Sequence, residues 1–269
     1  MCRLAYIKEP EKFGTENLTL LFTELEKSQG GDGNGIAGFS NGIPVCIKGA
    51  KLKIPELMQK IEGIKWDAGF IFHTRKSSKG EISDFNTHPF LTKNNYILAH
   101  NGHWSGADNF KPALLINGEI SLSDFLKCND SYIMSLLIDK FGFDAVELMT
   151  GTILVMNKND IILYNGGEFM RGDINETTIF ASEIPEELQC TNVKKFKSYY
   201  ISLKTYNLAD ESIYEKEQGY NKKKYSNYIT DIDKQISDYW TREKKDIKAE
   251  SEKKKILNQG WGYLDYDCY

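Results

Sequence analysis

The sequence has few of the residues from which metal sites and disulfide frameworks are built. Its 269 residues include five cysteines and four histidines, and no two cysteines have a CxxC spacing. An odd number of widely separated cysteines is typical neither of a disulfide framework nor of a zinc site. We therefore expect no metal and no cofactor, and at most one reactive thiol.

Long apolar runs and an excess of positive charge are also missing. No apolar stretch approaches the ~18 residues that span a bilayer. The start MCRLAYI is followed by the charged KEPEK, which is unlike a secretory signal. The net charge is −4, so no overall basic field attracts nucleic acid or anionic lipid. These features predict a cytoplasmic protein whose partners include neither membrane nor nucleic acid.

The apolar content, 41% of the residues, is enough for one large core. Asn41–Gly42 lies between two apolar runs and predicts a hairpin turn. Short runs rich in β-branched and aromatic residues, bounded by Gly, Asn or Asp, predict strands. They lie at residues 4–7, 35–39, 44–48, 69–73, 96–100, 152–156, 161–164, 178–181 and 199–203.

Three segments show the apolar spacing of amphipathic helices, at residues 15–28, 55–61 and 130–141. We expect Thr15 to cap the first helix and Gly142 to end the third. Many short strands with a few helices predict layered sheets covered by helices.

The composition changes near residue 208, which divides a body at 1–207 from an extension at 208–269. Within the extension, aromatic and aliphatic residues recur at helical spacing among charged residues, which predicts an amphipathic helix. Its apolar face either packs on the body or forms a docking surface for a partner protein.

Ordered short motifs carry a resemblance to a known family. They are MCRLAY, GDGNGIAGF, HTRKSSKG, NTHPF, LAHNG, NDS and FASE. Together they resemble the class II glutamine amidotransferases, over about residues 1–207, and the MCR start is similar to the stand-alone type. The resemblance implies a four-layer αββα sandwich, the N-terminal nucleophile hydrolase fold, followed by the helical extension.

Cys2 is the nucleophile that the resemblance implies; an inert buried cysteine is the alternative. Removal of Met1 would make Cys2 N-terminal and free an α-amine, a group whose pKa is ordinarily about 7.7–8.0. That amine can take the thiol proton and later return it to the leaving ammonia. Nucleophile and base would then belong to one residue.

The resemblance assigns oxyanion stabilisation to Asn101 and Gly102, which could otherwise form only a turn. It assigns the substrate carboxylate to Arg75, with Ser78 nearby, because a guanidinium can hold a carboxylate through two hydrogen bonds. Asp130 would receive the substrate α-ammonium; alternatively it is only a helix cap.

Three residues depart from the family pattern. Arg3 replaces the usual Gly, Lys76 replaces an apolar residue, and Lys79 stands where many members have His. These departures affect the expected specificity of the pocket. We interpret His73 and His100 as structural residues.

The predicted function is hydrolysis of the glutamine γ-amide through a Cys2 thioester, which gives glutamate and ammonia. A separate partner enzyme, docking on the extension, would accept the ammonia. One alternative is a γ-glutamyl amidohydrolase that acts on a larger metabolite. Another is a non-catalytic scaffold subunit that keeps the fold.

Overall fold

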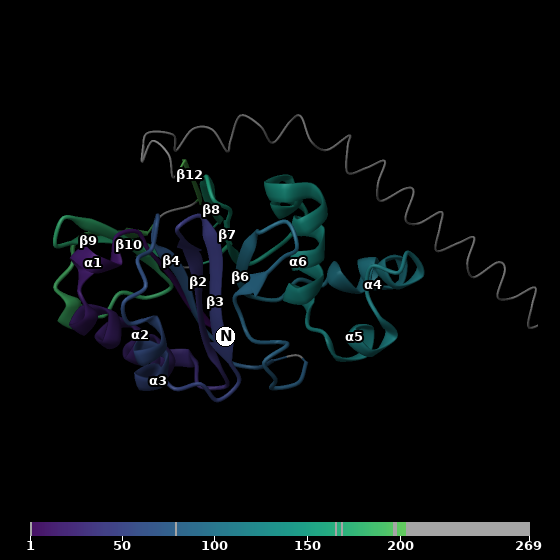
Figure 1. The fold of residues 1–269 in the computed structure, drawn as a ribbon, viewed down its shortest axis with the longest axis horizontal. Helices are drawn as coiled ribbons and strands as arrows, with labels where there is room; N and C mark the ends of the chain where they lie inside the picture. The colour runs from purple at the N-terminus through teal and green to yellow at the C-terminus, as the bar shows by residue number, and fades with distance from the viewer. Residues whose placement is uncertain (1, 79, 165, 168, 196–197, 203–269) are drawn as a thin grey trace, which may run out of the picture. The chain divides into compact units, whose positions relative to one another are not determined.

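The computed structural model describes residues 2–78, 80–164, 166–167, 169–195 and 198–202. These residues form two antiparallel sheets that lie face to face between layers of helices (Figure 1). The predicted C-terminal helix and the whole extension at 208–269 fall outside the described residues.

The larger sheet has seven strands, and every neighbouring pair is antiparallel. β1 lies in its middle, although it is the first strand of the chain. Across the sheet the order is β11 (Thr191–Lys195), β9 (Met170–Ile174), β10 (Thr177–Ala181), β1 (Arg3–Ile7), β4 (Phe70–Thr74), β2 (Asn34–Ser40) and β3 (Ile43–Gly49).

The smaller sheet has five strands and is antiparallel throughout. β6 occupies an inner position, and its last residue is Asn101. Across the sheet the order is β12 (Ser198–Ser202), β8 (Asp160–Tyr164), β7 (Thr152–Met156), β6 (Ile97–Asn101) and β5 (Phe90–Leu91).

The core between the two sheets follows from the alternation of side chains along each strand. In β1, Leu4 and Tyr6 point into the core between the sheets, where they meet Ala99 of β6 and Leu154 of β7. The intervening residue Ala5 joins the core on the opposite face. This two-residue period is that of a strand buried on both faces.

The outer face of the larger sheet is covered by α1 (Pro10–Phe13), α2 (Thr15–Gln29) and α3 (Ile54–Ile61). The apolar residues of α2 recur every three or four positions and are all buried, as the sequence pattern predicts. They are Leu18, Leu21, Phe22 and Leu25.

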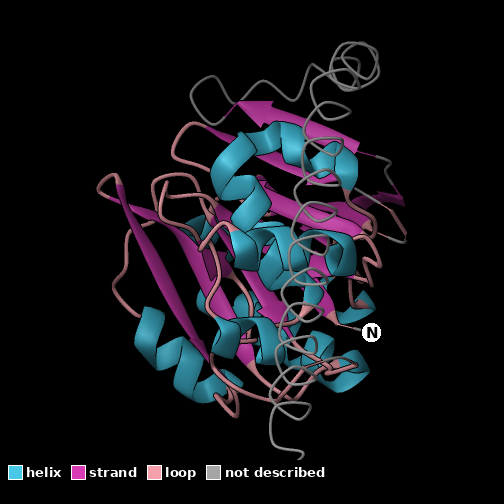
Figure 2. Ribbon diagram, turned by 90° about the vertical axis from the view of Figure 1, so that its right-hand side faces the viewer, coloured by secondary structure: helices cyan, strands magenta, loops and turns pink. Residues whose placement is uncertain are grey.

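The outer face of the smaller sheet is covered by α6 (Asp130–Phe141), which contacts β5 and β6. α4 (Ala107–Ile116) packs against α6, and α5 (Leu122–Lys127) packs against α4. In Figure 2 this helical layer faces the viewer. Two short 3₁₀ helices, Gly142–Leu148 and Glu186–Leu188, complete the fold. The expected four-layer αββα arrangement is therefore confirmed.

The nine predicted strands and the three predicted helices are all present. Asn41 and Gly42 both have positive φ, 52° and 73°, as a tight turn between β2 and β3 requires. The expected cap of α2 is wrong, because Gly14 holds the cap position and Thr15 is the first helical residue. Gly142 follows the last residue of α6, as predicted.

Described strands β5, β9 and β11 were not predicted. The two residues of β5 are too few to show a pattern. β9 has the sequence MRGDI and β11 the sequence TNVKK, and all five residues of β11 are exposed. β11 lies at the edge of its sheet with β9 beside it, and Gly172 is the one buried residue of these two strands, so neither shows an apolar alternation in the sequence.

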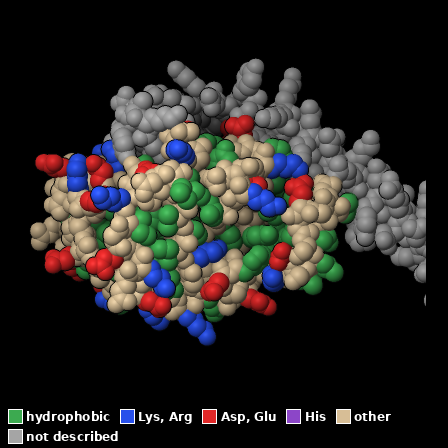
Figure 3. Space-filling view, in the orientation of Figure 1, with side chains coloured by type: hydrophobic (Ala, Val, Ile, Leu, Met, Phe, Trp, Pro, Cys, Tyr) green, Lys and Arg blue, Asp and Glu red, His purple; other side chains and the backbone are tan. Residues whose placement is uncertain are grey.

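Acidic and basic side chains are interspersed on the face of the molecule that Figure 3 shows. Within the described part of the chain, no helix combines the length and apolarity of a membrane-spanning segment.

The packing of α2 predicts the effect of truncating Phe22. Its ring is fully buried and stacks on Phe72 of β4, with the ring centroids 3.9 Å apart. Phe22→Ala should lower the free energy of unfolding by about 3–5 kcal/mol because it leaves a cavity. Lys27→Ala, on the exposed face of the same helix, should cost less than about 1 kcal/mol. Urea denaturation measures both, and equal losses would contradict this orientation of α2.

Candidate active site

The pairing of β1 with β4 determines what lies beside Cys2. Arg3 pairs with Thr74 in this antiparallel register. Continuing the register by one residue sets Cys2 opposite Arg75. The Cys2 thiol meets the loop after β4: its Sγ accepts from the Lys76 backbone N–H at 3.3 Å and donates to the Lys76 carbonyl at 3.5 Å.

The surroundings of Cys2 favour the neutral thiol. Burial raises the pKa of the Cys2 thiol above its ordinary value, and Asp130 raises it further. The Lys76 N–H and the positive charge of Arg75 act in the opposite direction and offset only part of this shift. A thiol with a raised pKa stays protonated near neutral pH, so it needs a nearby base to become a nucleophile.

Arg75 is buried, and the loops around it set its position. Its backbone N–H donates to the Gly33 carbonyl at 2.7 Å, and its carbonyl accepts from the Asp32 N–H at 2.9 Å. Its guanidinium donates to the Glu81 carbonyl at 2.8 Å and to the Ser77 hydroxyl at 3.1 Å. Burial lowers the pKa of Arg75, but an arginine stays charged in proteins.

The hydroxyl that the structure places against this guanidinium belongs to Ser77. Ser78, which the resemblance puts near the substrate carboxylate, is exposed, and its assigned role stays a prediction. Ser77 is held by its own backbone N–H, which donates to the Asp32 carboxylate at 2.9 Å. The glycine-rich GDGNG segment thus supports the loop that follows Arg75.

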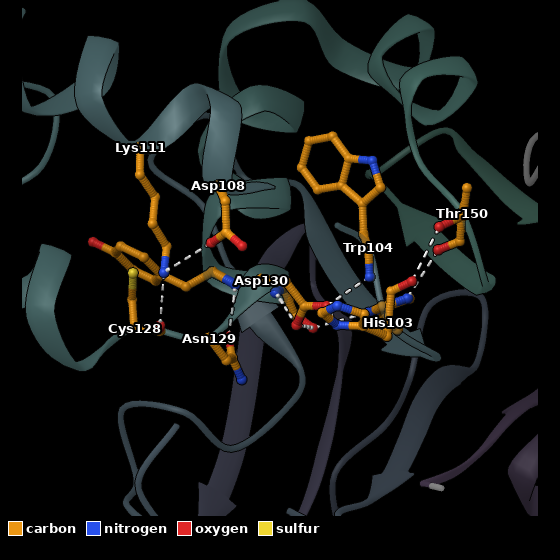
Figure 4. A network of polar contacts seen from close by, with 11 residues as sticks. His103, Trp104, Asp108, Lys111, Cys128, Asn129, Asp130 and Thr150 are labelled. Carbon is orange, nitrogen blue, oxygen red and sulfur yellow. Dashed lines mark hydrogen bonds and ion pairs between the residues drawn. The ribbon is translucent and has the colours of Figure 1, made fainter. Parts of the chain in front are cut away.

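Asp130 is the first residue of α6, but it is not the helix cap. Asn129 caps the helix, because its side-chain oxygen accepts from the Tyr132 N–H. Asp130 instead accepts from the Trp104 backbone N–H at 2.8 Å and lies 3.2 Å from Nδ1 of His103. Figure 4 shows this arrangement. The alternative in which Asp130 is only a cap is therefore wrong.

A buried asparagine joins the supports of Arg75 and Asp130. Asn129 donates its backbone N–H to Asn86 Oδ1 at 3.0 Å and its side-chain amide to the Asn86 carbonyl at 3.1 Å. Asn86 Nδ2 donates to the Glu81 carbonyl, which also accepts from Arg75. Arg75 and Asp130, which are far apart in the sequence, are thus linked by hydrogen bonds between neutral groups.

Asn101 and Gly102 end β6 and begin the loop after it. Gly102 has φ +144°, and a Cβ there would lie 3.0 Å from Gly151 Cα. Glycine is therefore required for this close approach of two backbones. The side-chain oxygen of Asn101 is buried and has no hydrogen-bond partner among the described residues, so the fold leaves that part of the amide unused.

Three buried histidines join the two sheets beneath these residues. His73 of β4 lies 3.2 Å from the carbonyl of His100 of β6, and its ring stacks on His88. Burial lowers the pKa of His73 to about 3 and that of His88 well below its ordinary value. His100 contacts the Ser131 hydroxyl and the Thr150 carbonyl, one with each ring nitrogen. These neutral rings connect the end of β4, beside Arg75, to the end of β6, beside Asn101.

Two of the departures from the family pattern can be located. Arg3 turns toward α2, where it contacts Ser28 and Gln29, and it forms an ion pair with Glu183. The Lys76 side chain is exposed and lies 4.0 Å from Asp32. Lys79 falls outside the described residues.

Sequence reasoning missed four residues that support the site: Asp32, Ser77, Asn86 and Asn129. All four lie inside the short motifs that carry the resemblance, so the sequence identified their segments but not these residues. Their roles depend on hydrogen bonds between residues distant in the sequence, which local patterns do not reveal.

Comparison with known proteins finds a family and solved structures that are similar to this chain. Residues 17–142 match the family described as glutamine amidotransferases class-II, a segment that contains Arg75, Asn101 and Asp130 and begins after Cys2. The search of curated proteins gives no match.

Two solved structures share the fold. One is a glutamine phosphoribosylpyrophosphate amidotransferase from B. subtilis complexed with ADP and GMP, at 21% identity and a TM-score of 0.57. The other is described as the allosteric regulatory enzyme of purine biosynthesis, at 20% identity and a TM-score of 0.60. Each match covers 75% of this chain and 47% of the other, so the chain spans about half their length. The predicted N-terminal nucleophile hydrolase fold is confirmed.

The hydrogen bonds of Asn86 predict a structural role for its side chain. Asn86→Ala leaves the Asn129 N–H and the Lys127 carbonyl without their partner inside the protein. Each unsatisfied buried group costs about 1–3 kcal/mol, so the free energy of unfolding should fall by at least that amount. Asn109→Ala, at an exposed position of α4, is the matched control and should change it by less than about 0.5 kcal/mol. Equal stability of the two variants in urea would show that Asn86 does not hold the site together.

Proposed function

Because this chain is a relative of the class II glutamine amidotransferases in both sequence and fold, we propose that it hydrolyses the γ-amide of glutamine through a Cys2 thioester. The products are glutamate and ammonia. One observation carries the proposal: the Cys2 thiol lies at the start of a central strand, opposite Arg75, and Asp130 is near enough to influence its pKa.

The first step is activation of the thiol. Removal of Met1 frees the Cys2 α-amine, which takes the thiol proton directly or through a water molecule. A base is needed because the pKa of the thiol is raised, so the thiol would otherwise remain protonated at neutral pH. The buried histidines do not supply the base in this proposal, because burial lowers the pKa values of His73, His88 and His100.

The second step is attack of the thiolate on the carboxamide carbon. A C–S bond forms, and the carbonyl oxygen gains negative charge. The Asn101 side-chain amide and the Gly102 N–H stabilise this oxyanion, and the loss of one such donor typically costs about 10²–10³ in rate. The C–N bond then breaks, and ammonia leaves with the proton held by the α-amine. Water attacks the resulting thioester and releases glutamate and the free thiol.

Glutamine is recognised in this proposal by two opposite charges. The Arg75 guanidinium binds the α-carboxylate, and the Asp130 carboxylate binds the α-ammonium. Neutral groups hold both: the Glu81 carbonyl and Ser77 orient Arg75, while the Trp104 and Ser131 N–H groups orient Asp130. Two oriented charges can distinguish a γ-glutamyl amide from other amides.

We propose that a partner enzyme accepts the ammonia and docks on the extension at 208–269. The basis is the sequence of the extension, which has the pattern of an amphipathic helix. An amide larger than glutamine is the other substrate to test, so ammonia release should be assayed with γ-glutamyl derivatives beside glutamine.

Cys2→Ala is expected to abolish ammonia release from glutamine, because no other group in the proposal forms the thioester. Its free energy of unfolding should change by less than about 1 kcal/mol, since the residue is half-buried and lies at the end of a strand. Cys190→Ala, which removes a half-buried thiol beside β9, is the matched control and should keep its activity. Intact mass should show that Met1 is absent. Full turnover by Cys2→Ala would exclude the mechanism, whereas no ammonia release by the wild-type protein would favour a non-catalytic scaffold.

Arg75→Lys is expected to raise KM for glutamine by about 10–100-fold, because an ammonium cannot reproduce the two parallel bonds of a guanidinium. The matched control is Arg171→Lys on β9, where the arginine forms an ion pair with Asp173 instead. That variant should leave KM close to the wild-type value. An unchanged KM in Arg75→Lys would show that the substrate carboxylate binds elsewhere.

A further inference from the structure

The Asp130 carboxylate is already fully engaged by the protein. Oδ1 accepts from the Ser131 backbone N–H at 2.9 Å and lies 3.4 Å from the Ser131 hydroxyl. Oδ2 accepts from the Trp104 backbone N–H at 2.8 Å and lies 3.2 Å from His103 Nδ1. Four contacts occupy the lone-pair positions of one carboxylate. An incoming ammonium group must therefore displace one of them.

Only one of these four contacts can leave without disturbing the fold. The Ser131 and Trp104 N–H groups belong to the backbone, and the Ser131 hydroxyl is buried and also contacts His100. The His103 side chain, in contrast, is 47% exposed, so rotation about its side-chain bonds moves the ring into solvent. Figure 4 shows His103 beside Asp130, with its carbonyl held by Thr150.

We propose that the His103 side chain occupies the position of the substrate α-ammonium and must swing away when substrate binds. This inference rests on the proposed function, because it takes Asp130 to be the ammonium site. His103 is then a specificity-determining residue: a substrate with an α-ammonium competes with the imidazole for Asp130, whereas an amide without that group does not.

The competition takes place at one carboxylate oxygen, because His103 Nδ1 lies 3.2 Å from Asp130 Oδ2. The charged or titratable groups around the pair are Asp130 on α6, His100 on β6, and Arg75 and Cys2, which interact with Asp130. An α-ammonium that reaches Asp130 must displace the imidazole, so substrate affinity should increase when the imidazole is removed.

The test measures binding in the full chain carrying Cys2→Ala, which cannot turn glutamine over. Calorimetry with L-glutamine gives the dissociation constant of each variant. Adding His103→Ala should tighten binding by up to about 5-fold, the range of a partly exposed ion pair. His103→Lys, which places an ammonium beside Asp130, should bind glutamine weakly.

A second ligand separates the ammonium site from the rest of the pocket. Glutaramate, which has the carboxylate and the amide of glutamine but no α-amine, should bind with the same affinity whether residue 103 is His or Ala. Glutamine binding that does not depend on residue 103 would overturn the inference and leave the proposed function intact. No binding of glutamine at all would overturn both.

Discussion

The antiparallel pairing of β1 with β4 is the constraint on which the arrangement around Cys2 depends. Leu4 and Tyr6 face the core between the sheets, while Ala5 and Ile7 face the helices, and all four are buried. A slip of one residue would exchange these faces, so the core enforces the register. The same register sets Cys2 opposite Arg75. Core packing therefore positions a residue that lies outside the strand itself.

Neutral groups hold the charges of the site in place. Arg75 is oriented by a carbonyl and a hydroxyl, Asp130 by backbone N–H groups, and Asn86 links their supports. A fully satisfied network of this kind is rigid, which favours a pre-organised site. The histidines beneath it remain neutral because burial lowers the pKa values of His73 and His88. The charged side chains that influence the Cys2 thiol include Arg75 and Asp130, the two groups proposed to bind substrate.

The elements that could be predicted are those with a buried face. β1 appears in the sequence as a short continuous apolar run, because both of its faces are buried, and α2 appears as apolar residues that recur every three or four positions. β9 and β11 could not be predicted, because Gly172 is their one buried residue and their side chains therefore follow no hydrophobic period. The Thr15 cap failed for a related reason: a threonine near a helix start is compatible with more than one position in the first turn.

The order of motifs along the chain was enough to identify Cys2, Arg75, Asn101 and Asp130 as candidates, and the resemblance assigned them roles. The tertiary structure alone decided that Asn129 rather than Asp130 caps α6 and that Ser77 contacts the guanidinium. It also revealed His103 against Asp130. The physical reason is that a sequence records the periodicity of buried faces and the order of side chains. Hydrogen bonds between loops depend on distances that exist only after the sheets and helices have packed.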